Sequence, residues 1–144
     1  MKIHYILKTA FCLLAGAAFL TPIHAAEKEL KSVAVTVGDL GNPFFVQIAR
    51  GAEAKAKEVN PNVKFTSLSS NYDVNNQTNQ VDNLISSGTS LLLLNAADSK
   101  GIAPAVKRAK SAGMAVIAVD VGAEGGVDAT VTSNNQDVDR QSSR

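Results

Sequence analysis

Apolar and polar positions form two kinds of pattern along the chain, one typical of buried strands and the other of amphipathic helices. Short runs rich in apolar residues are each followed by a longer segment with apolar residues three and four positions apart. The pattern predicts five strands, at residues 33–37, 63–68, 91–94, 115–119 and 129–132. It predicts three helices, at 43–59, at 74–87, and in a stretch that holds Pro104 in its first turns and ends at Gly113.

The degree of alternation within each predicted strand indicates its place in the sheet. Residues 63–68 alternate apolar and polar side chains, as an edge strand buried on one side would. Residues 91–94 and 115–119 are apolar throughout, which is typical of central parallel strands covered on both faces. Strands that alternate with helices of this length predict an α/β fold with a right-handed, doubly wound parallel sheet.

Four predicted loops meet at the carboxyl edge of such a sheet, where open α/β sheets bind their ligands. They are residues 38–42, 69–73, 95–98 and 120–122. In the first loop, Asn42 is a good N-cap, and Pro43 suits the first helical position because its missing N–H group costs nothing there. We therefore expect the first strand to end and the first helix to begin within about five residues.

Two aromatic residues, Phe44 and Phe45, occupy the first turn of that helix, at the mouth of the predicted edge. Because a core normally places its phenylalanines further along a helix, the pair predicts a platform for an uncharged cyclic ligand. The alternative is that both rings plug the top of the core, and the pattern alone leaves both interpretations open.

Asp120 ends the apolar strand at 115–119, so its carboxylate is expected at the same mouth. There it can accept hydrogen bonds from two hydroxyl groups of a polyol, and such charge-assisted bonds are worth roughly 1.5–3 kcal/mol each. The structural alternative is an aspartate that caps the following loop or helix. Asn42 has a similar choice, because its side chain can bind a ligand or cap its helix, and the cap alone is worth about 1 kcal/mol.

Three other polar patterns do not predict a catalytic or phosphate site. Asp39, Asp98 and Asp120 are single acids, whereas a phosphoacceptor or magnesium cluster of the receiver-domain kind needs paired acids at one strand end. The flexible, glycine-rich loop 122–126 precedes a strand rather than a helix, which is the wrong context for a phosphate-binding turn. Residues 75–80, NNQTNQ, are interpreted as the solvated start of a helix.

The first 26 residues are predicted to be a secretory signal peptide rather than part of the fold. Lys2 and Lys8 give a basic start, and residues 10–20 form an apolar run too short to span a bilayer. Small residues follow, with cleavage expected after Ala25 or Ala26. The rest of the chain is predicted to form a ligand-binding lobe at 27–135 and a polar tail at 136–144.

The composition restricts the chemistry open to the mature chain. The single cysteine, Cys12, and both histidines, His4 and His24, fall within the predicted signal peptide. This excludes a cysteine nucleophile, a redox pair, a thiolate metal site and imidazole chemistry, so no enzyme activity, metal or other cofactor is predicted. Removing Lys2 and Lys8 from the 14 basic residues leaves 12 against 13 acidic ones. The resulting net charge of −1 argues against nucleic acid and anionic membrane as partners.

Four segments of the chain, taken in order, resemble the periplasmic sugar-binding proteins of ABC transporters, the ribose-binding type of type I periplasmic binding proteins. They are GNPFF at 41–45, LNAADS at 94–99, VIAVD at 116–120 and VTSNN at 131–135. The resemblance implies the Rossmann-like, amino-terminal lobe of that family. It also implies a periplasmic, monomeric protein whose partners are a monosaccharide or related polyol and the permease of an ABC transporter.

The resemblance also implies roles for individual residues. Asn42, Phe44 and Phe45 are expected to contact the sugar, the two rings by stacking on it. Asp120 is expected to bind the sugar hydroxyl groups. Val121 stands where the ribose-binding pattern has an arginine, so one hydrogen-bond donor is missing and the sugar need not be ribose.

The length of the chain is the larger departure from the resemblance. Members of that family have two lobes joined by three crossing strands, and Ser133, Asn134 and Asn135 correspond to the first crossing at the hinge. The second lobe is expected to be missing, which predicts a truncated or frameshifted chain with half a binding site. The expected function is sugar capture by a receptor of which this chain is the amino-terminal lobe. The alternative is a secreted regulatory or interaction domain that keeps the fold without sugar binding.

Overall fold

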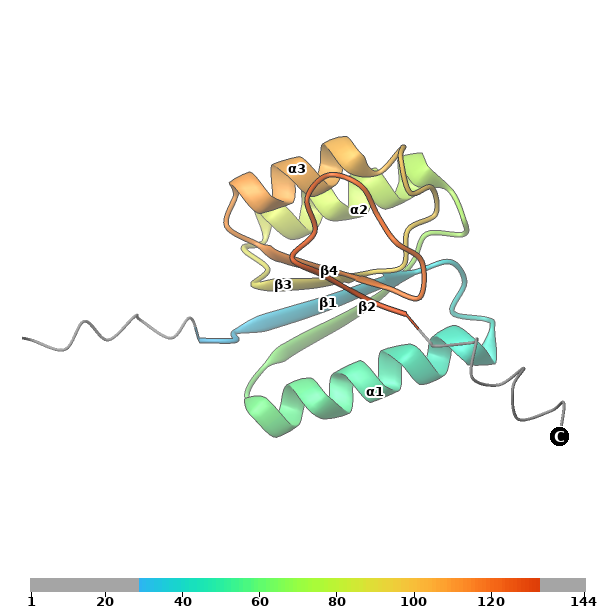
Figure 1. The fold of residues 1–144 in the computed structure, drawn as a ribbon. Helices are drawn as coiled ribbons and strands as arrows, with labels where there is room; N and C mark the ends of the chain where they lie inside the picture. The colour runs from blue at the N-terminus through green and yellow to red at the C-terminus, as the bar shows by residue number, and fades with distance from the viewer. Residues whose placement is uncertain (1–28, 133–144) are drawn as a thin grey trace, which may run out of the picture.

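A computed structural model describes residues 29–132, and these residues form a β-sheet between two layers of helix (Figure 1). The predicted signal peptide at 1–26, the hinge residues Ser133, Asn134 and Asn135, and the polar tail at 136–144 lie outside the described residues. The strands are β1 (Ser32–Val37), β2 (Lys64–Ser69), β3 (Leu91–Leu94), β4 (Ala115–Val119) and β5 (Ala129–Val131). The helices are α1 (Pro43–Val59), α2 (Val74–Ser86) and α3 (Ala103–Ser111).

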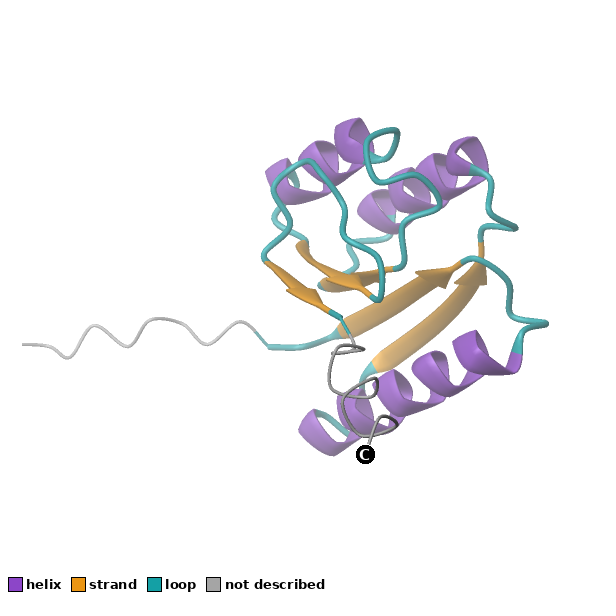
Figure 2. Ribbon diagram, turned by 45° about the vertical axis from the view of Figure 1, so that its right-hand side comes forward, coloured by secondary structure: helices purple, strands orange, loops and turns teal. Residues whose placement is uncertain are grey.

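The sheet is parallel throughout, with its strands in the order β2–β1–β3–β4–β5. In register, Val35 of β1 lies between Ser67 of β2 and Leu93 of β3, and Leu93 lies beside Ile117 of β4. Helix α1 covers one face, and α2 and α3 cover the other, as Figure 2 shows from a second direction. This arrangement confirms the predicted doubly wound α/β fold.

The helices begin and end at the capping signals in the sequence. Asn42 has extended backbone angles, and its side-chain Oδ1 accepts a hydrogen bond from the Phe44 N–H group at 3.0 Å. Helix α2 starts after Asp73, whose side chain accepts from two backbone N–H groups of the first turn. Gly88, with φ of 70°, follows the end of α2 in the left-handed conformation that glycine tolerates. The predicted bounds of α1 are confirmed, and α2 ends one residue earlier than predicted.

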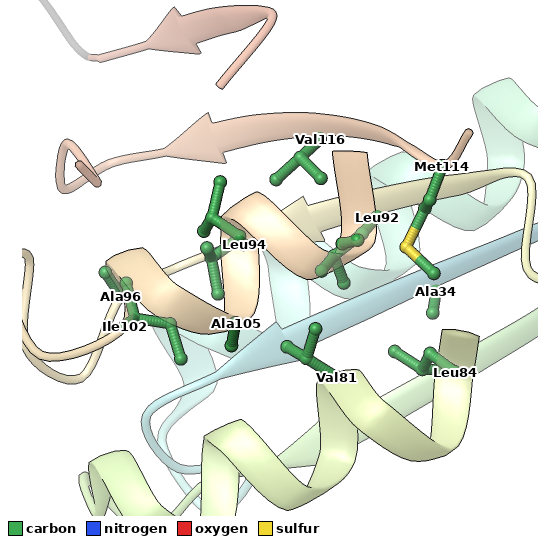
Figure 3. Packing of buried hydrophobic residues seen from close by; sticks show 12 residues of the cluster. Ala34, Val81, Leu84, Leu92, Leu94, Ala96, Ile102, Ala105, Met114 and Val116 are labelled. Atoms are coloured by element: carbon green, nitrogen blue, oxygen red, sulfur yellow. The ribbon is translucent and has the colours of Figure 1, made fainter. Parts of the chain in front are cut away.

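Most of the core lies between the sheet and the α2–α3 layer. Its side chains come from α2, α3 and one face of β1, β3 and β4, and several of them are shown in Figure 3. Leu92, Ile102 and Val116 within it are completely buried. The α1 side of the sheet holds two smaller clusters, one around Val35 and Phe45 and the other around Val33. The two faces of the sheet are therefore unequally covered.

The burial of individual strands corrects two predictions. In β3 and β4, Leu92 and Val116 face α2 and α3 and are fully buried, while Leu93 and Ile117 on the other face are half-buried. Helix α1 packs against β1 and β2, and no second helix among residues 29–132 covers β4 on that face.

The strand at 63–68 does lie at an edge, but it is not buried on one side only. Phe65 packs toward α1, and Leu68 packs into the larger cluster on the opposite face.

The glycine-rich loop after β4 is packed against α3, which differs from the flexible loop that was expected. Ala123 and Val127 rest on the larger core cluster, and the Glu124 N–H group donates a hydrogen bond to the Ser99 carbonyl at 2.9 Å. Gly125 adopts φ of 106°, close to the backbone of Ala103. The loop thus leads the chain over α3 before it enters β5.

Candidate ligand-binding edge of the sheet

The carboxyl ends of the parallel strands bring the predicted site loops to one edge of the sheet. Asn42 follows β1 there, and Asp120 follows β4. Asn42 is exposed, and its Oδ1 caps α1, as one of its two predicted roles required. Its Nδ2 donates no hydrogen bond to any other described residue. One half of this amide is therefore structural, and the other half faces solvent with its donors available.

The two adjacent phenylalanines have different environments. The Phe44 ring is 52% exposed, whereas Phe45 is 7% exposed and packs with Val35, Val37 and Ala49 under α1. Their ring centroids lie 5.3 Å apart at an interplanar angle of 66°, an edge-to-face contact. Phe45 thus plugs the core and supports Phe44, while Phe44 presents its ring at the edge. The core interpretation is therefore confirmed for Phe45 alone, and the ligand contact of either ring stays a prediction.

A third aromatic residue at this edge was not identified from the sequence. Tyr72, in the loop after β2, is 60% exposed, and its ring centroid lies 6.2 Å from that of Phe45. Asn71 and Tyr72 both have positive φ, of 55° and 58°, which is rare for residues other than glycine. An aromatic residue inside a polar loop at a strand's carboxyl end was the available signal.

Phe44 and Asp120 line the same surface hollow, of about 370 Å³. Most of its lining residues are apolar, and Asp120 is the one charged residue among them. Asn42 and Phe45 do not line this hollow, although both lie at the same edge of the sheet. The complete lining consists of Phe44, Ile48, Val119, Asp120, Val131 and Thr132.

Asp120 itself lies in a tight turn. Its φ is 65°, and a hydrogen bond of 2.8 Å from the Val121 N–H group to the Val119 carbonyl closes the turn around it. The Asp120 N–H group donates to the Val131 carbonyl at 2.8 Å, which ties the turn to β5. Its carboxylate Oδ2 accepts a hydrogen bond from the side-chain amide of Asn95 at 3.2 Å, and it caps no helix among the described residues.

Beneath the edge, a continuous row of buried and partly buried hydrogen bonds joins the ends of four strands. We call it the polar seam, and it runs from the β2 end through α2 to Asp120. Its contacts are Gln80 Nε2 to Ser69 O at 2.8 Å, Thr36 Oγ1 to Gln80 Oε1 at 2.7 Å, Gln77 Nε2 to Thr36 Oγ1 at 3.2 Å, Gln77 Nε2 to Asn95 O at 2.9 Å, and Asn95 Nδ2 to Asp120 Oδ2 at 3.2 Å.

The polar seam corrects the interpretation of residues 75–80 as a solvated helix start. Gln77 is fully buried, and Asn95 is 4% exposed. The signal was available in the helical spacing, because Gln77 lies three residues after Val74 and four before Val81, on the stripe that faces the sheet. A polar residue on that stripe predicts a buried hydrogen bond when the polar run around it is not taken as one block.

Neither a group of metal ligands nor a membrane-crossing helix occurs in the described part of the chain. Within residues 29–132, no group of three or more His, Cys, Asp and Glu side chains is arranged to hold a metal ion. None of the three helices is long and apolar enough to cross a membrane. The groups present at the edge are an exposed ring, a carboxylate and an amide, and such groups can recognise a neutral polar ligand.

Sequence comparison identifies the family to which this arrangement belongs. The profile of the periplasmic binding protein domain matches residues 33–141, so the chain belongs to the periplasmic binding protein domain family. The ribose import binding protein of Bacillus subtilis is 34% identical over 125 residues, which are 86% of this chain and 40% of that protein. The D-ribose/D-allose-binding protein of Pseudomonas aeruginosa is 33% identical over 118 residues, 79% of this chain and 37% of that protein.

Solved structures agree with the fold. The myo-inositol binding protein of Caulobacter, bound to myo-inositol, matches this chain with a TM-score of 0.66 and 28% identity. The match covers 80% of this chain and 39% of the Caulobacter protein. A periplasmic ribose ABC transporter structure from Conexibacter woesei matches with a TM-score of 0.67 and 26% identity. This match covers 78% of this chain and 37% of the Conexibacter protein. The chain thus spans less than half the length of these relatives.

Proposed function

We propose that this chain is the amino-terminal lobe of a sugar-binding protein that serves an ABC importer, and that it supplies one half of the cleft for a monosaccharide or related polyol. The observation that carries the proposal is the hollow shared by Phe44 and Asp120 at the carboxyl edge of the sheet. Support comes from relatives named for ribose, D-allose and myo-inositol, all of them compounds with several hydroxyl groups.

The chemistry of the edge suits such a ligand. The exposed ring of Phe44 offers an apolar surface on which the C–H face of a sugar ring can stack. Asp120 can accept hydrogen bonds from sugar hydroxyl groups, and charge-assisted hydrogen bonds of this kind contribute roughly 1.5–3 kcal/mol each. The Nδ2 group of Asn42 adds a donor, while Phe45 supports Phe44 from below.

The identity of the sugar is the least constrained part of the proposal. Val121 offers no hydrogen bond from its side chain at the position of the expected arginine, and it is exposed beside Asp120. The absence of that donor favours a ligand that makes fewer polar contacts beside Asp120 than ribose makes in the ribose-binding type. The other lobe of the cleft would supply the remaining contacts.

The cellular setting follows from the same proposal. A basic start and a short apolar run at residues 1–26 fit export to the periplasm. There the sugar-loaded protein would deliver its ligand, as a monomer, to the membrane permease of the importer, with no catalytic step and no nucleic acid partner. No observation on the described residues favours the alternative of a regulatory domain without sugar binding.

A fused two-lobed protein tests this function. Residues 27–135 would be joined to the part of the Bacillus subtilis relative that this chain does not span, and calorimetry would measure D-ribose, D-allose and myo-inositol binding. We expect one of these compounds to bind, with affinity reduced at least tenfold by Asp120→Asn. The control Glu58→Gln removes an exposed carboxylate at the far end of α1 and should leave affinity unchanged. Equal affinities for both variants would contradict the role of Asp120.

A further inference from the structure

Asp120 has a backbone conformation that its residue type does not favour. A three-residue turn with positive φ at its centre is rare, and a residue with a Cβ atom adopts it only when neighbouring groups hold it there. At Asp120 the turn closes through the Val121 N–H group and the Val119 carbonyl. The groups that hold this turn are therefore candidates for a role in the site.

Asn95 holds the turn from two sides. Its Nδ2 donates to the Val119 carbonyl, which closes the turn, and to Oδ2 of Asp120, the residue at the centre of the turn, both at 3.2 Å. Asn95 is 4% exposed, so water competes little for these hydrogen bonds. Its own N–H group is paired with the Thr36 carbonyl at 2.9 Å, which anchors Asn95 to the end of β1.

Gln77 in turn fixes the position of Asn95. The fully buried amide of Gln77 donates to the Asn95 carbonyl at 2.9 Å, and its Oε1 accepts from the Ala97 N–H group at 2.9 Å. One side chain from α2 thus holds the loop after β3 at two points, the carbonyl group of Asn95 and the N–H group of Ala97. No buried side-chain nitrogen or oxygen among the described residues lacks a partner, so this network is complete.

We propose that Asn95 is the positioning residue that sets the conformation of Asp120 before any ligand arrives. By engaging Oδ2, Asn95 leaves Oδ1, which accepts no hydrogen bond from the described residues, as the oxygen directed to a ligand hydroxyl group. The ligand part of this statement rests on the proposed function. The positioning part does not, because it concerns the free chain alone. Pre-organisation of this kind lowers the cost of ordering the site on binding.

Nuclear magnetic resonance on the isotope-labelled full chain, without sugar, tests the positioning. A positive φ brings an amide hydrogen close to the Hα atom of its own residue, so Asp120 should give a strong intraresidue nuclear Overhauser effect. We expect Asn95→Asp, which loses both donated hydrogen bonds, to weaken this signal to that of ordinary extended residues. Ser70→Ala is the control, because it removes a buried side-chain hydrogen bond, to the Val37 carbonyl, that belongs to neither the polar seam nor the turn.

The result that overturns the proposal is a folded Asn95→Asp variant that keeps the Asp120 signal, or a wild-type chain that lacks it. If Asn95→Asp does not fold, Asn95→Ser replaces it, since the shorter hydroxyl cannot reach both acceptors. A second measurement uses Asp120→Gly, because glycine adopts positive φ without strain. The fall in unfolding temperature caused by the Asn95 substitution should be at least halved in that background, and an unchanged fall would also contradict the proposal.

Discussion

Gly38 lies directly beneath the ring of Tyr72. A Cβ atom built on Gly38 would be 2.3 Å from Cε1 of Tyr72, so only glycine allows the ring to rest there. Gly38 is buried, while Tyr72 is 60% exposed and makes an edge contact with Phe45. Because Gly38 has no side chain, the Tyr72 ring can lie over the end of β1 and extend the aromatic surface of the ligand edge toward β2.

The first prediction concerns this contact. Gly38→Ala should push the Tyr72 ring outward and cost about 1–2 kcal/mol of unfolding free energy, because overpacking strains a site whose neighbour can partly move. Tyr5 lies in the predicted signal peptide, so Tyr72 is the single fluorescent tyrosine of the mature chain, which also has no tryptophan. Its emission and quenching by iodide should change on substitution. Unchanged quenching would show that the ring does not rest on Gly38.

The second prediction compares two other glycines. Gly125 has φ of 106°, and a Cβ atom there would be 2.6 Å from the Ala103 carbonyl oxygen, a backbone atom that cannot move aside easily. Gly125→Ala should therefore lower the unfolding free energy by about 3 kcal/mol. Gly51, in the middle of α1, has no atom within 4 Å of such a Cβ. Gly51→Ala should stabilise the chain by about 0.5–1 kcal/mol.

Chemical denaturation of both variants measures this difference. If Gly125→Ala and Gly51→Ala have similar unfolding free energies, the loop after β4 is not packed on α3 as described.

The third prediction concerns acid sensitivity. The Asp128 carboxylate accepts hydrogen bonds from the Lys110 ammonium group and from the Val116 N–H group, and these lower the pKa of Asp128. A lowered folded-state pKa contributes stability that is present above the unfolded pKa of about 3.9 and is lost as the pH falls through the folded value. The melting temperature should therefore fall below about pH 4, and less steeply in Asp128→Asn. Identical acid branches in wild type and variant would contradict this.

The fourth prediction concerns the face of the sheet beside α1. Val131 of β5 is 60% exposed, and β5 is paired with β4 alone in the described part of the chain. A second apolar hollow on this face lies between α1 and the strands, lined among others by Val33, Val59 and Leu93. Exposed apolar surface and an unpaired strand edge both promote association, so the chain should self-associate as its concentration rises.

Sedimentation velocity of two lysine variants separates these two causes. Val131→Lys places a charge on the exposed face and should reduce association more than Thr130→Lys, which places it on the opposite face of the same strand. The stability of the chain should also fall at or below the usual range of about 5–15 kcal/mol. A clean monomer with a sharp transition at a temperature typical of complete domains would contradict this prediction.

Local signals in the sequence were sufficient for the elements of the fold. Asn42 and Pro43 placed the start of α1, and the apolar runs placed β3 and β4, because capping and burial depend on residues close in sequence. The one-sided cover of β3 and β4 was not predictable, because it depends on how many helices reach each face. An apolar run has the same sequence pattern whether the second face of its strand is fully or only half covered.

The candidate site was predictable in its position but not in its support. Asp120 and Phe44 were expected at the edge because the strand and helix bounds place them there. Asn95 and Gln77 were missed, since their role depends on contacts between β3, α2 and β4 that no short pattern encodes. The positive φ of Asp120 was not predictable either, because the residues hydrogen-bonded to its turn, Asn95 and Val131, are distant in sequence.

The central claim is that this chain supplies one half of a sugar-binding cleft, and paired calorimetric titrations test it most directly. D-ribose, D-allose and myo-inositol would be titrated into the chain alone and into the fused two-lobed protein. The account predicts no micromolar binding to the chain alone, because sugar hydroxyl groups on one open face stay hydrated and contribute little net free energy. It predicts that the fused protein recovers binding of at least one sugar. Micromolar affinity of the chain alone, or a fused protein that folds and binds none of the three, would contradict it.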